Sequence, residues 1–182
     1  MKSDDNKNLP KIIENSGLAL HKTRNLLSIT DKILASKTLV TEQQIGKFII
    51  KDGIATDTET GLTWLRFAHG QRWGNGNVVG DAEQFTWDDA MKIPDTFNQQ
   101  GYAGYNDWRV PDVDELKSLI DKIKGNEGNY IDADVFPENE PWFWSSSPDA
   151  VSSYGAWGVY FGYGSSHYFD KLSNSYVRLV RG

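Results

Sequence analysis

The chain contains three histidines, His21, His69 and His167, the residue type that most often binds metals or transfers protons near neutral pH. They are far apart in the sequence, and no His-x-x-x-His or glutamate-assisted pair gives them the spacing of a zinc site. The chain has no cysteine, which excludes thiolate metal sites, thiol nucleophiles and disulfides. We therefore expect a structural or incidental role for each histidine, and we predict no metal and no other cofactor.

Serine and acidic residues supply the remaining candidates for chemistry. Ser145, Ser146 and Ser147 have no histidine close by in the sequence and lie in no nucleophile-elbow motif, which disfavours a hydrolase. Hard cations prefer several oxygen ligands, and one acidic stretch near Pro137 carries them. Its candidate ligands are Asp132, Asp134, Glu138 and Asn139. Their spacing fits no calcium loop, so a solvated acidic loop is favoured over a calcium site, which stays open.

Residues 145–170 have a different composition, in which tyrosine, serine and glycine dominate. This mixture is typical of antibody paratopes, because tyrosine offers rigid contact area while serine and glycine adapt to a ligand. Within residues 156–161, period-two alternation places Trp157 and Val159 on a core face and Gly158 and Tyr160 on a face that can bind. The segment is therefore the candidate ligand-binding region.

Composition narrows the class of partner. The net charge of -6 and pI near 5.0 provide no basic surface for phosphates, which disfavours nucleic acid. The N-terminus lacks the apolar region of a secretory signal, and no stretch reaches the 18 or so apolar residues of a membrane span. We expect a cytoplasmic protein with no membrane span.

The first part of the chain, residues 1–44, is expected to be a polar N-terminus followed by an amphipathic helix over residues 16–37. Leu26, Ile29, Ile33 and Leu34 recur at helical spacing while charged residues take the other face. This apolar stripe either packs on the following domain or mediates homo-oligomerisation or docking to a partner. The pattern leaves both interpretations open.

Residues 45–182 form the main domain, in which strands, two helices and further strands follow one another. This order predicts an α+β domain whose termini meet in one sheet. The loop over residues 70–80 is expected to be flexible, and the second helix is expected to carry Leu116, Leu119, Ile120 and Ile123 on its apolar face until Gly125 ends it. The expected strands are 48–50, 54–57 and 62–67, then consecutive strands from 142 and a last one over 176–181. The first helix is expected to begin at Trp87 and to fade near Pro94 or after it.

Three motifs occur in a specific order. They are Asp57-x-x-Thr60-Gly61-Leu62-Thr63-Trp64, Gly104-Tyr105-Asn106-Asp107-Trp108-Arg109-Val110-Pro111-x-x-x-Glu115-Leu116, and Phe143-Trp144-Ser145-Ser146-Ser147 with a terminal Val177-Arg178-Leu179-Val180-Arg181-Gly182. Together they resemble the Lcl C-terminal domain family, bacterial domains related to the C-type lectin fold, over roughly residues 50–182. The resemblance implies a C-type-lectin-like domain with a twisted antiparallel sheet, used for binding.

The resemblance also bears on two further points. Asp107 and Arg109 lie inside the second motif, so a structural ion pair or turn cap is favoured over a catalytic pair. Family members often carry two cysteines that this chain lacks, near Ile93-Pro94 and at Leu179, which agrees with a reducing compartment. The catalytic relatives of the fold, the formylglycine-generating enzymes, depend on cysteine thiols. We therefore predict that the protein is not an enzyme.

One absence points to how the binding region varies. Lys, Glu, Gln and Met make up 29 of the 182 residues, yet none of them falls within residues 145–170. These four types cannot be reached from an asparagine codon by changing its adenines, whereas Ser, Tyr, Gly, Asp and His can. The segment thus resembles the variable proteins of diversity-generating retroelements, which are diversified at adenines. Ordinary loop chemistry, which also favours Ser and Gly, remains the alternative.

The predicted function is a non-enzymatic, receptor-type module that binds an unknown protein or glycan; the alternative is an oligomeric assembly protein with a lectin-like domain that is not diversified. The expected core anchors are Trp64, Trp87, Trp108, Trp144 and Trp157. The binding positions should be exposed. They are Ser152, Ser153, Tyr154, Gly158, Tyr160, Tyr163, Ser166, His167, Tyr168 and Asp170.

Overall fold

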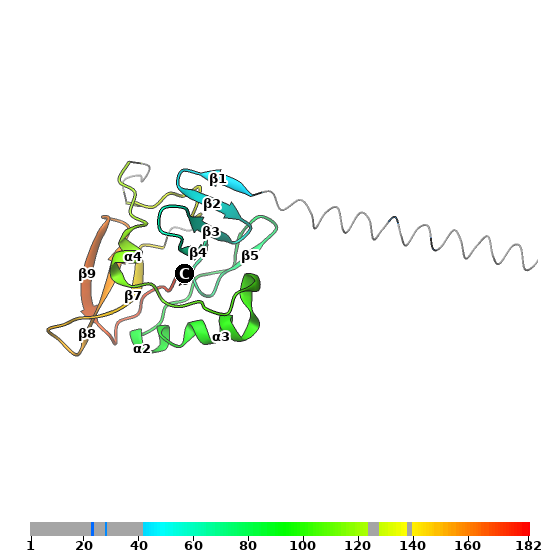
Figure 1. The fold of residues 1–182 in the computed structure, drawn as a ribbon. Coiled ribbons are helices and arrows are strands. Elements are labelled where there is room, and N and C mark those ends of the chain that lie inside the picture. The colour runs from blue at the N-terminus through cyan, green and yellow to red at the C-terminus, as the bar shows by residue number, and fades with distance from the viewer. Residues whose placement is uncertain (1–22, 24–27, 29–41, 124–127, 138–139) are drawn as a thin grey trace, which may run out of the picture. The chain divides into compact units, whose positions relative to one another are not determined.

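The structure is a computed structural model that describes residues 23, 28, 42–123, 128–137 and 140–182. The chain divides into two compact units, Met1–Thr41 and Glu42–Gly182. The helix predicted over residues 16–37 lies outside the described residues except for Thr23 and Ser28. The elements described below all belong to the second unit (Figure 1).

The first sheet has five antiparallel strands in the order β1-β2-β3-β4-β10. The Asp52-Gly53 pair forms the predicted turn between β2 and β3, and Asp52 adopts a φ of 51° there. β10, the last strand of the chain, pairs with β4. This pairing confirms the prediction that the ends of the domain meet in one sheet. The strands are β1 (Gln43–Ile45), β2 (Phe48–Lys51), β3 (Ile54–Asp57), β4 (Thr63–Leu65) and β10 (Val180–Arg181).

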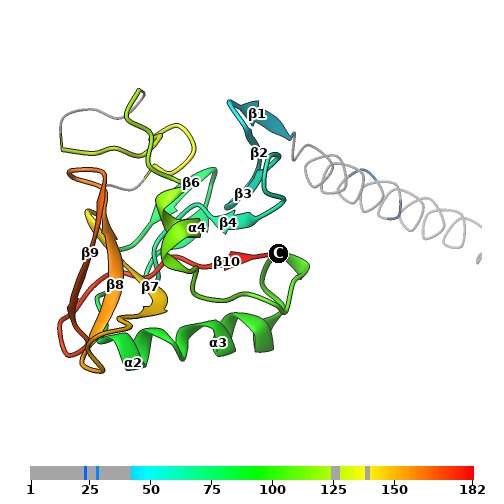
Figure 2. The same cartoon turned by 60° about the vertical axis from the view of Figure 1, so that its left-hand side comes forward.

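The second large sheet has three antiparallel strands in the order β7-β8-β9. These strands confirm the consecutive antiparallel strands predicted after Trp142. Figures 1 and 2 place this sheet at the opposite side of the unit from β1 to β3, with β9 outermost. Its strands are β7 (Trp142–Pro148), β8 (Gly155–Tyr160) and β9 (Ser165–Asp170).

A two-stranded hairpin occupies the stretch that was predicted as a flexible loop. β5 (Arg72–Gly74) and β6 (Asn77–Val79) pair around Asn75-Gly76, whose φ values are 54° and 79°. Asn-Gly is the dipeptide that most favours a type I′ hairpin turn, because both residues tolerate positive φ. The loop prediction was wrong, since it gave weight to the glycine content and missed this turn signal.

The first predicted helix is divided into two, and the second is shorter than predicted. They are α2 (Trp87–Ala90), α3 (Ile93–Gln100), the 3-10 helix η1 (Tyr102–Gly104) and α4 (Val113–Lys117). Pro94 does not end the first helix but lies in the first turn of α3, where the N–H that proline lacks would have no helical acceptor. α4 ends at Lys117 rather than near Gly125, because Ile120 forms a β-bridge with Ile131. Ile123, predicted on its apolar face, is 96% exposed.

The core consists of two apolar clusters around buried aromatic residues. Trp64, Trp108 and Trp144 are fully buried, as predicted. Trp87 is partly buried and packs against the second cluster. Trp157 is partly buried and contacts Tyr168, which corrects its assignment as a core anchor. The described helices include none with the length and apolarity that a membrane span requires.

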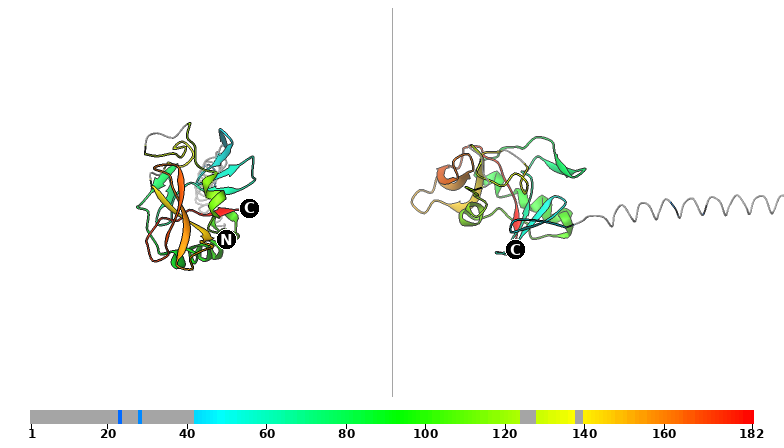
Figure 3. Two further views of the ribbon diagram at one scale, coloured as in Figure 1. Left: turned by 90° about the vertical axis from the view of Figure 1, so that its left-hand side faces the viewer. Right: turned by 90° about the horizontal axis from the view of Figure 1, so that it is seen from above.

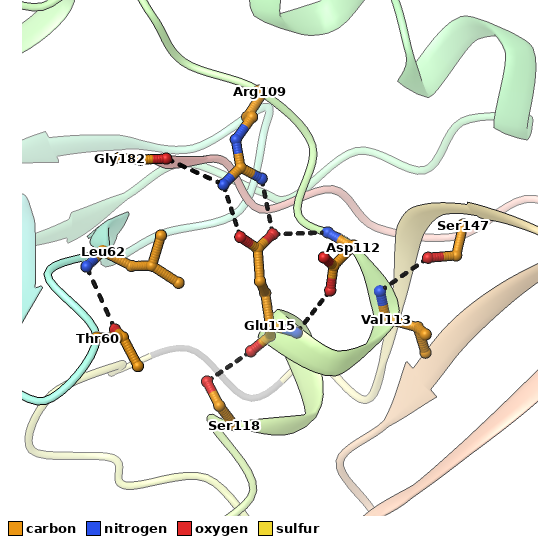
Figure 4. Close-up of polar contacts among 9 residues, drawn as sticks. All are labelled: Thr60, Leu62, Arg109, Asp112, Val113, Glu115, Ser118, Ser147 and Gly182. Carbon is orange, nitrogen blue, oxygen red and sulfur yellow. Dashed lines mark hydrogen bonds and ion pairs between the residues drawn. The ribbon is translucent and has the colours of Figure 1, made fainter.

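An arginine–glutamate pair fixes α4 to the rest of the domain (Figure 4). Two guanidinium nitrogens of Arg109 donate to the two carboxylate oxygens of Glu115 at 2.7 and 2.6 Å, and one also donates to the carbonyl of Gly182 at 3.2 Å. The same carboxylate accepts from the backbone N–H of Asp112 at 2.8 Å, and the Asp112 side chain caps Glu115 N in return. The Glu115 side chain thus caps the N-terminus of α4 and, through Arg109, links it to Gly182.

The predicted pairing of Asp107 with Arg109 is replaced by two separate pairs. Asp107 accepts two hydrogen bonds from Arg181, at 2.7 and 3.0 Å, while Arg109 holds Glu115. Both pairs join the second motif to the end of the chain or to α4. The structural role predicted for Asp107 and Arg109 therefore holds, with different partners.

The Glu115→Gln variant should lower the free energy of unfolding by about 1–2 kcal/mol at neutral pH, because it replaces a charge-assisted bidentate contact by a neutral one. Urea denaturation followed by tryptophan fluorescence measures this change. Asp114→Asn is the matched control, since Asp114 is 84% exposed and pairs with Lys117 on the solvent side. That variant should cost about 0.5 kcal/mol or less.

The loss in Glu115→Gln should also depend on pH. The hydrogen bonds from Arg109 lower the pKa of Glu115 in the folded protein. Its contribution to stability is therefore complete above the ordinary glutamate pKa of about 4.3 and disappears as the pH falls toward the lower folded value. The gap between wild type and variant should close on acidification, and a gap that stays constant into the acid range would contradict this pairing.

Candidate ligand-binding surface

The predicted binding positions fall into three groups by exposure. Six are exposed and lie on or beside β9: Ser153, Tyr154, Tyr163, His167, Tyr168 and Asp170. Ser152, Tyr160 and Ser166 are half-buried, and Gly158 is buried. We call the six exposed residues the ribbon surface, because they follow the β8–β9 ribbon from one end to the other.

Strand pairing explains how β9 positions the ribbon surface. β9 pairs with β8 along its whole length, from Gly155 opposite Asp170 to Tyr160 opposite Ser165. Its other edge has no strand next to it in the described chain, and Figure 3 shows the β8–β9 ribbon on the face that is turned toward the viewer. Side chains of β9 therefore lie at the margin of the sheet, where both faces reach solvent.

Gly158 was expected to lie on the binding face of β8, and the structure contradicts this. β8 is the central strand, so a core cluster containing Val159 covers one face and Phe169 covers the other. A methyl group at Gly158 would lie 2.7 Å from the carbonyl oxygen of Phe143 and 2.9 Å from the ring of Phe169. Period-two alternation fails here because both faces of the strand are covered.

Aromatic contacts between neighbouring strands support the ribbon surface. Tyr160 stacks on Trp142 with ring centroids 4.3 Å apart, and Tyr163 packs edge-on against Tyr160 at 4.9 Å. Trp157 meets the ring of Tyr168 edge-on at 5.9 Å. Trp157 therefore supports an exposed tyrosine rather than filling the core.

Large apolar side chains are unusually exposed in this part of the chain. Of the eight large hydrophobic residues that are exposed among the described residues, five fall between positions 151 and 172. Tyr154 is 78% exposed, Tyr163 75% and Tyr168 61%. Val151 and Leu172, which are not among the predicted binding positions, are 95% and 81% exposed. Exposed apolar groups concentrated in one region mark an interaction surface.

An open depression of about 430 Å³ adjoins the ribbon surface. Its lining residues are Trp142, His167, Tyr168, Phe169, Ser173 and Asn174. Four of these were not predicted, because Ser173 and Asn174 lie after the paratope-like segment and because no binding role was assigned to Trp142 and Phe169. The depression combines aromatic walls with hydroxyl and amide groups, a combination suited to holding a side chain of a ligand.

The other residues considered for chemistry have structural contacts. Ser145 is buried and donates to the carbonyl of Trp157 at 2.7 Å, while the Ser147 hydroxyl accepts from Val113 N at 3.0 Å. His69 lies between the rings of Phe85 and Phe97, and burial lowers its pKa although Glu83 opposes this. His21 lies outside the described residues.

The acidic stretch considered for calcium is described only in part. Asp132 is buried, and its carboxylate accepts from the backbone N–H of Asp134 at 3.1 Å. The carbonyl oxygen of Asp134 accepts a hydrogen bond from Arg66. Residues 138 and 139 lie outside the described part. Within that part, no group of three or more histidine, aspartate or glutamate side chains is arranged to hold a metal ion.

The described unit is a mixed α+β domain built on antiparallel sheets with short helices, and its most exposed aromatic residues gather on one ribbon. The family model of the Lcl C-terminal domain matches residues 53–181. The chain therefore belongs to the Lcl C-terminal domain family, which confirms the resemblance seen in its three motifs. A comparison with curated proteins found no match.

The Gly158→Ala variant should destabilise the domain by about 1–3 kcal/mol, because the added methyl group overpacks the space between β7 and Phe169. Thermal unfolding followed by circular dichroism measures this loss. Ser153→Ala, at an exposed position of the same ribbon, serves as the control and should stay within about 0.5 kcal/mol of wild type. Equal stability of both variants would mean that Gly158 has more space than the structure gives it.

Proposed function

We propose that the domain is a non-enzymatic ligand-binding module, with a C-type-lectin-like scaffold that displays the ribbon surface to a protein or glycan ligand. The observation that carries this proposal is the concentration of exposed aromatic side chains on β9 and its flanking loops. An outer strand ordinarily carries lysine or other charged residues that keep it in solution. Apart from Asp170 at its end, β9 carries only uncharged types and histidine.

The proposal extends to how the surface varies. Ribbon positions consist of Tyr, Ser, His and Asp, which are all reachable from an asparagine codon by adenine changes. Trp157 is not reachable in this way, and it lies partly buried beside Tyr168, its partner across the strands. This separation of changeable exposed residues from a constant support fits diversification by a retroelement that mutates adenines. We also propose that the protein acts in the cytoplasm. The absence of cysteine supports this, because a domain without disulfides needs no oxidising compartment.

Sequencing the coding segment across a population of source cells tests the proposal without any ligand. We expect substitutions at adenines to concentrate in the codons of the six ribbon residues. Codons for Trp157, Gly158 and Arg178 should stay constant, because these residues support the ribbon, fill a closed space or lie fully buried. The codons of residues 43–123 provide the internal control.

Two results would contradict the proposal in different ways. Variation spread evenly over residues 43–182, or absent throughout, would remove diversification and leave a lectin-like domain with a fixed surface. Variation concentrated at buried positions such as Ala156 or Phe161 would remove the ribbon surface as the variable element.

A further inference from the structure

The β9 strand is an open sheet edge of six residues, Ser165–Asp170. The opposite edge of the same sheet is covered, because Tyr176 exchanges backbone hydrogen bonds with Trp142 and Trp144 of β7 at 3.1 and 3.0 Å. The outer strands of the five-stranded sheet, β1 and β10, have only three and two residues. Among the described strands, β9 is therefore the longest edge that could accept another strand.

Hydrogen bonding fixes which backbone groups of β9 point outward. Lys171 N donates to the carbonyl of Tyr154 at 2.9 Å, in the same register that pairs Gly155 with Asp170. Because hydrogen-bonded and non-hydrogen-bonded pairs alternate in an antiparallel ladder, the backbone groups of Ser166, Tyr168 and Asp170 point away from β8. In the described part of the chain, no backbone hydrogen bond outside the sheet uses their N–H groups, whereas the carbonyl of Asp170 accepts from Ser173 N at 2.8 Å.

Of the usual protections of a sheet edge, β9 has only the charge of Asp170 at its end. Natural edges carry lysine, proline or a bulge that hinders further pairing. The sequence of β9, Ser-Ser-His-Tyr-Phe-Asp, has neither lysine nor proline, and its pairing with β8 proceeds without a register shift. The edge thus combines three outward donors with a regular backbone.

Two features beside the edge describe the strand that would fit it. The depression lined by Trp142, His167 and Phe169 opens on the face that would receive alternate side chains of an added strand. Asp170 is exposed, and its carboxylate accepts from Leu172 N at 2.8 Å without a cation paired to it in the described chain. An apolar side chain suits the depression, and a lysine or arginine suits Asp170.

We propose that the ligand of the ribbon surface is an extended protein segment, with an apolar and a basic residue, that pairs with β9 as an additional strand. This proposal rests on the binding function proposed above and specifies the ligand class. Backbone hydrogen bonds to Ser166, Tyr168 and Asp170 supply affinity that does not depend on side chains. Diversification of the ribbon residues then changes specificity while the pairing edge is retained. A second copy of this chain fits less well, because two molecules of net charge -6 repel each other.

Peptides selected from a random-sequence library of strand length on the full chain serve as the probe. Methylating the backbone nitrogen of successive peptide residues, one at a time, distinguishes strand pairing from side-chain recognition. We expect alternation, in which every second methylation weakens binding about 5- to 10-fold and the intervening ones have little effect. Isothermal titration calorimetry measures the affinities.

The protein side of the experiment removes one outward donor. Ser166→Pro deletes the outward N–H, and proline is tolerated on the free side of an edge strand. It should weaken binding about 5-fold or more, whereas Ser166→Ala keeps the N–H and should bind nearly as wild type. Should Ser166→Pro fail to fold, the methylated peptides still decide the question.

Each other outcome overturns the strand-addition proposal. Peptides that tolerate every methylation but lose affinity for Tyr154→Ala and Tyr163→Ala would leave the ribbon surface as a binding site and remove strand pairing. Peptides indifferent to all ribbon substitutions would remove the binding surface as well. Failure to select any peptide would exclude extended segments as ligands. A peptide-free dimer that Ser166→Pro converts to monomer would assign the edge to a second copy of the chain.

Discussion

The closing segment of the chain, residues 175–182, is the constraint on which the arrangement of the domain depends. It runs from the three-stranded sheet to the five-stranded sheet and bonds to both. Tyr176 pairs with β7, and Leu179 accepts from Leu65 N at 3.0 Å while Val180 pairs with Trp64 of β4. Arg178 is fully buried between the rings of Phe136 and Phe143, at 4.4 and 5.0 Å, and burial lowers its pKa to about 9. Figure 2 shows this segment passing behind α4.

The connections made by this segment bring together family motifs that lie far apart in the sequence. Arg109 bonds to Glu115 and Gly182, and Asp107 bonds to Arg181, so the second motif and the last residues form one junction. The junction fixes α4, and α4 packs on the three-stranded sheet. Contacts that hold the sheet therefore come from its inner side. The free edge of β9 makes no strand pairing in the described chain. Its exposed side chains can therefore change at little cost in stability.

The sequence was sufficient for the mixed α+β class with antiparallel sheets, for most strands and for the pairing of the last strand with the first sheet. It failed where tertiary contacts outweigh local pattern. Ile120 and Ile123 have helical spacing, but a bridge to Ile131 ends the helix early. Gly158 has the spacing of an outward residue, yet the ring of Phe169 and the carbonyl of Phe143 cover its side of β8. Six of the ten predicted binding positions are exposed, because Tyr, Ser and His cluster where the strand meets solvent. The depression was missed, since Trp142 and Phe169 are common core residues whose partial exposure depends on the end of the sheet.

We propose that the residues of the ribbon surface contribute little to the stability of the fold. A display library sorted for folding tests this proposal. All six ribbon residues, Ser153, Tyr154, Tyr163, His167, Tyr168 and Asp170, would be randomised together, and protease resistance of the displayed chain would report folding. We expect most such variants to resist protease nearly as well as the wild type does. A parallel library at Ala156, Gly158 and Phe161, which are buried, should lose resistance in most members. Equal loss in both libraries would contradict the account, because the ribbon residues would then be part of what holds the domain together.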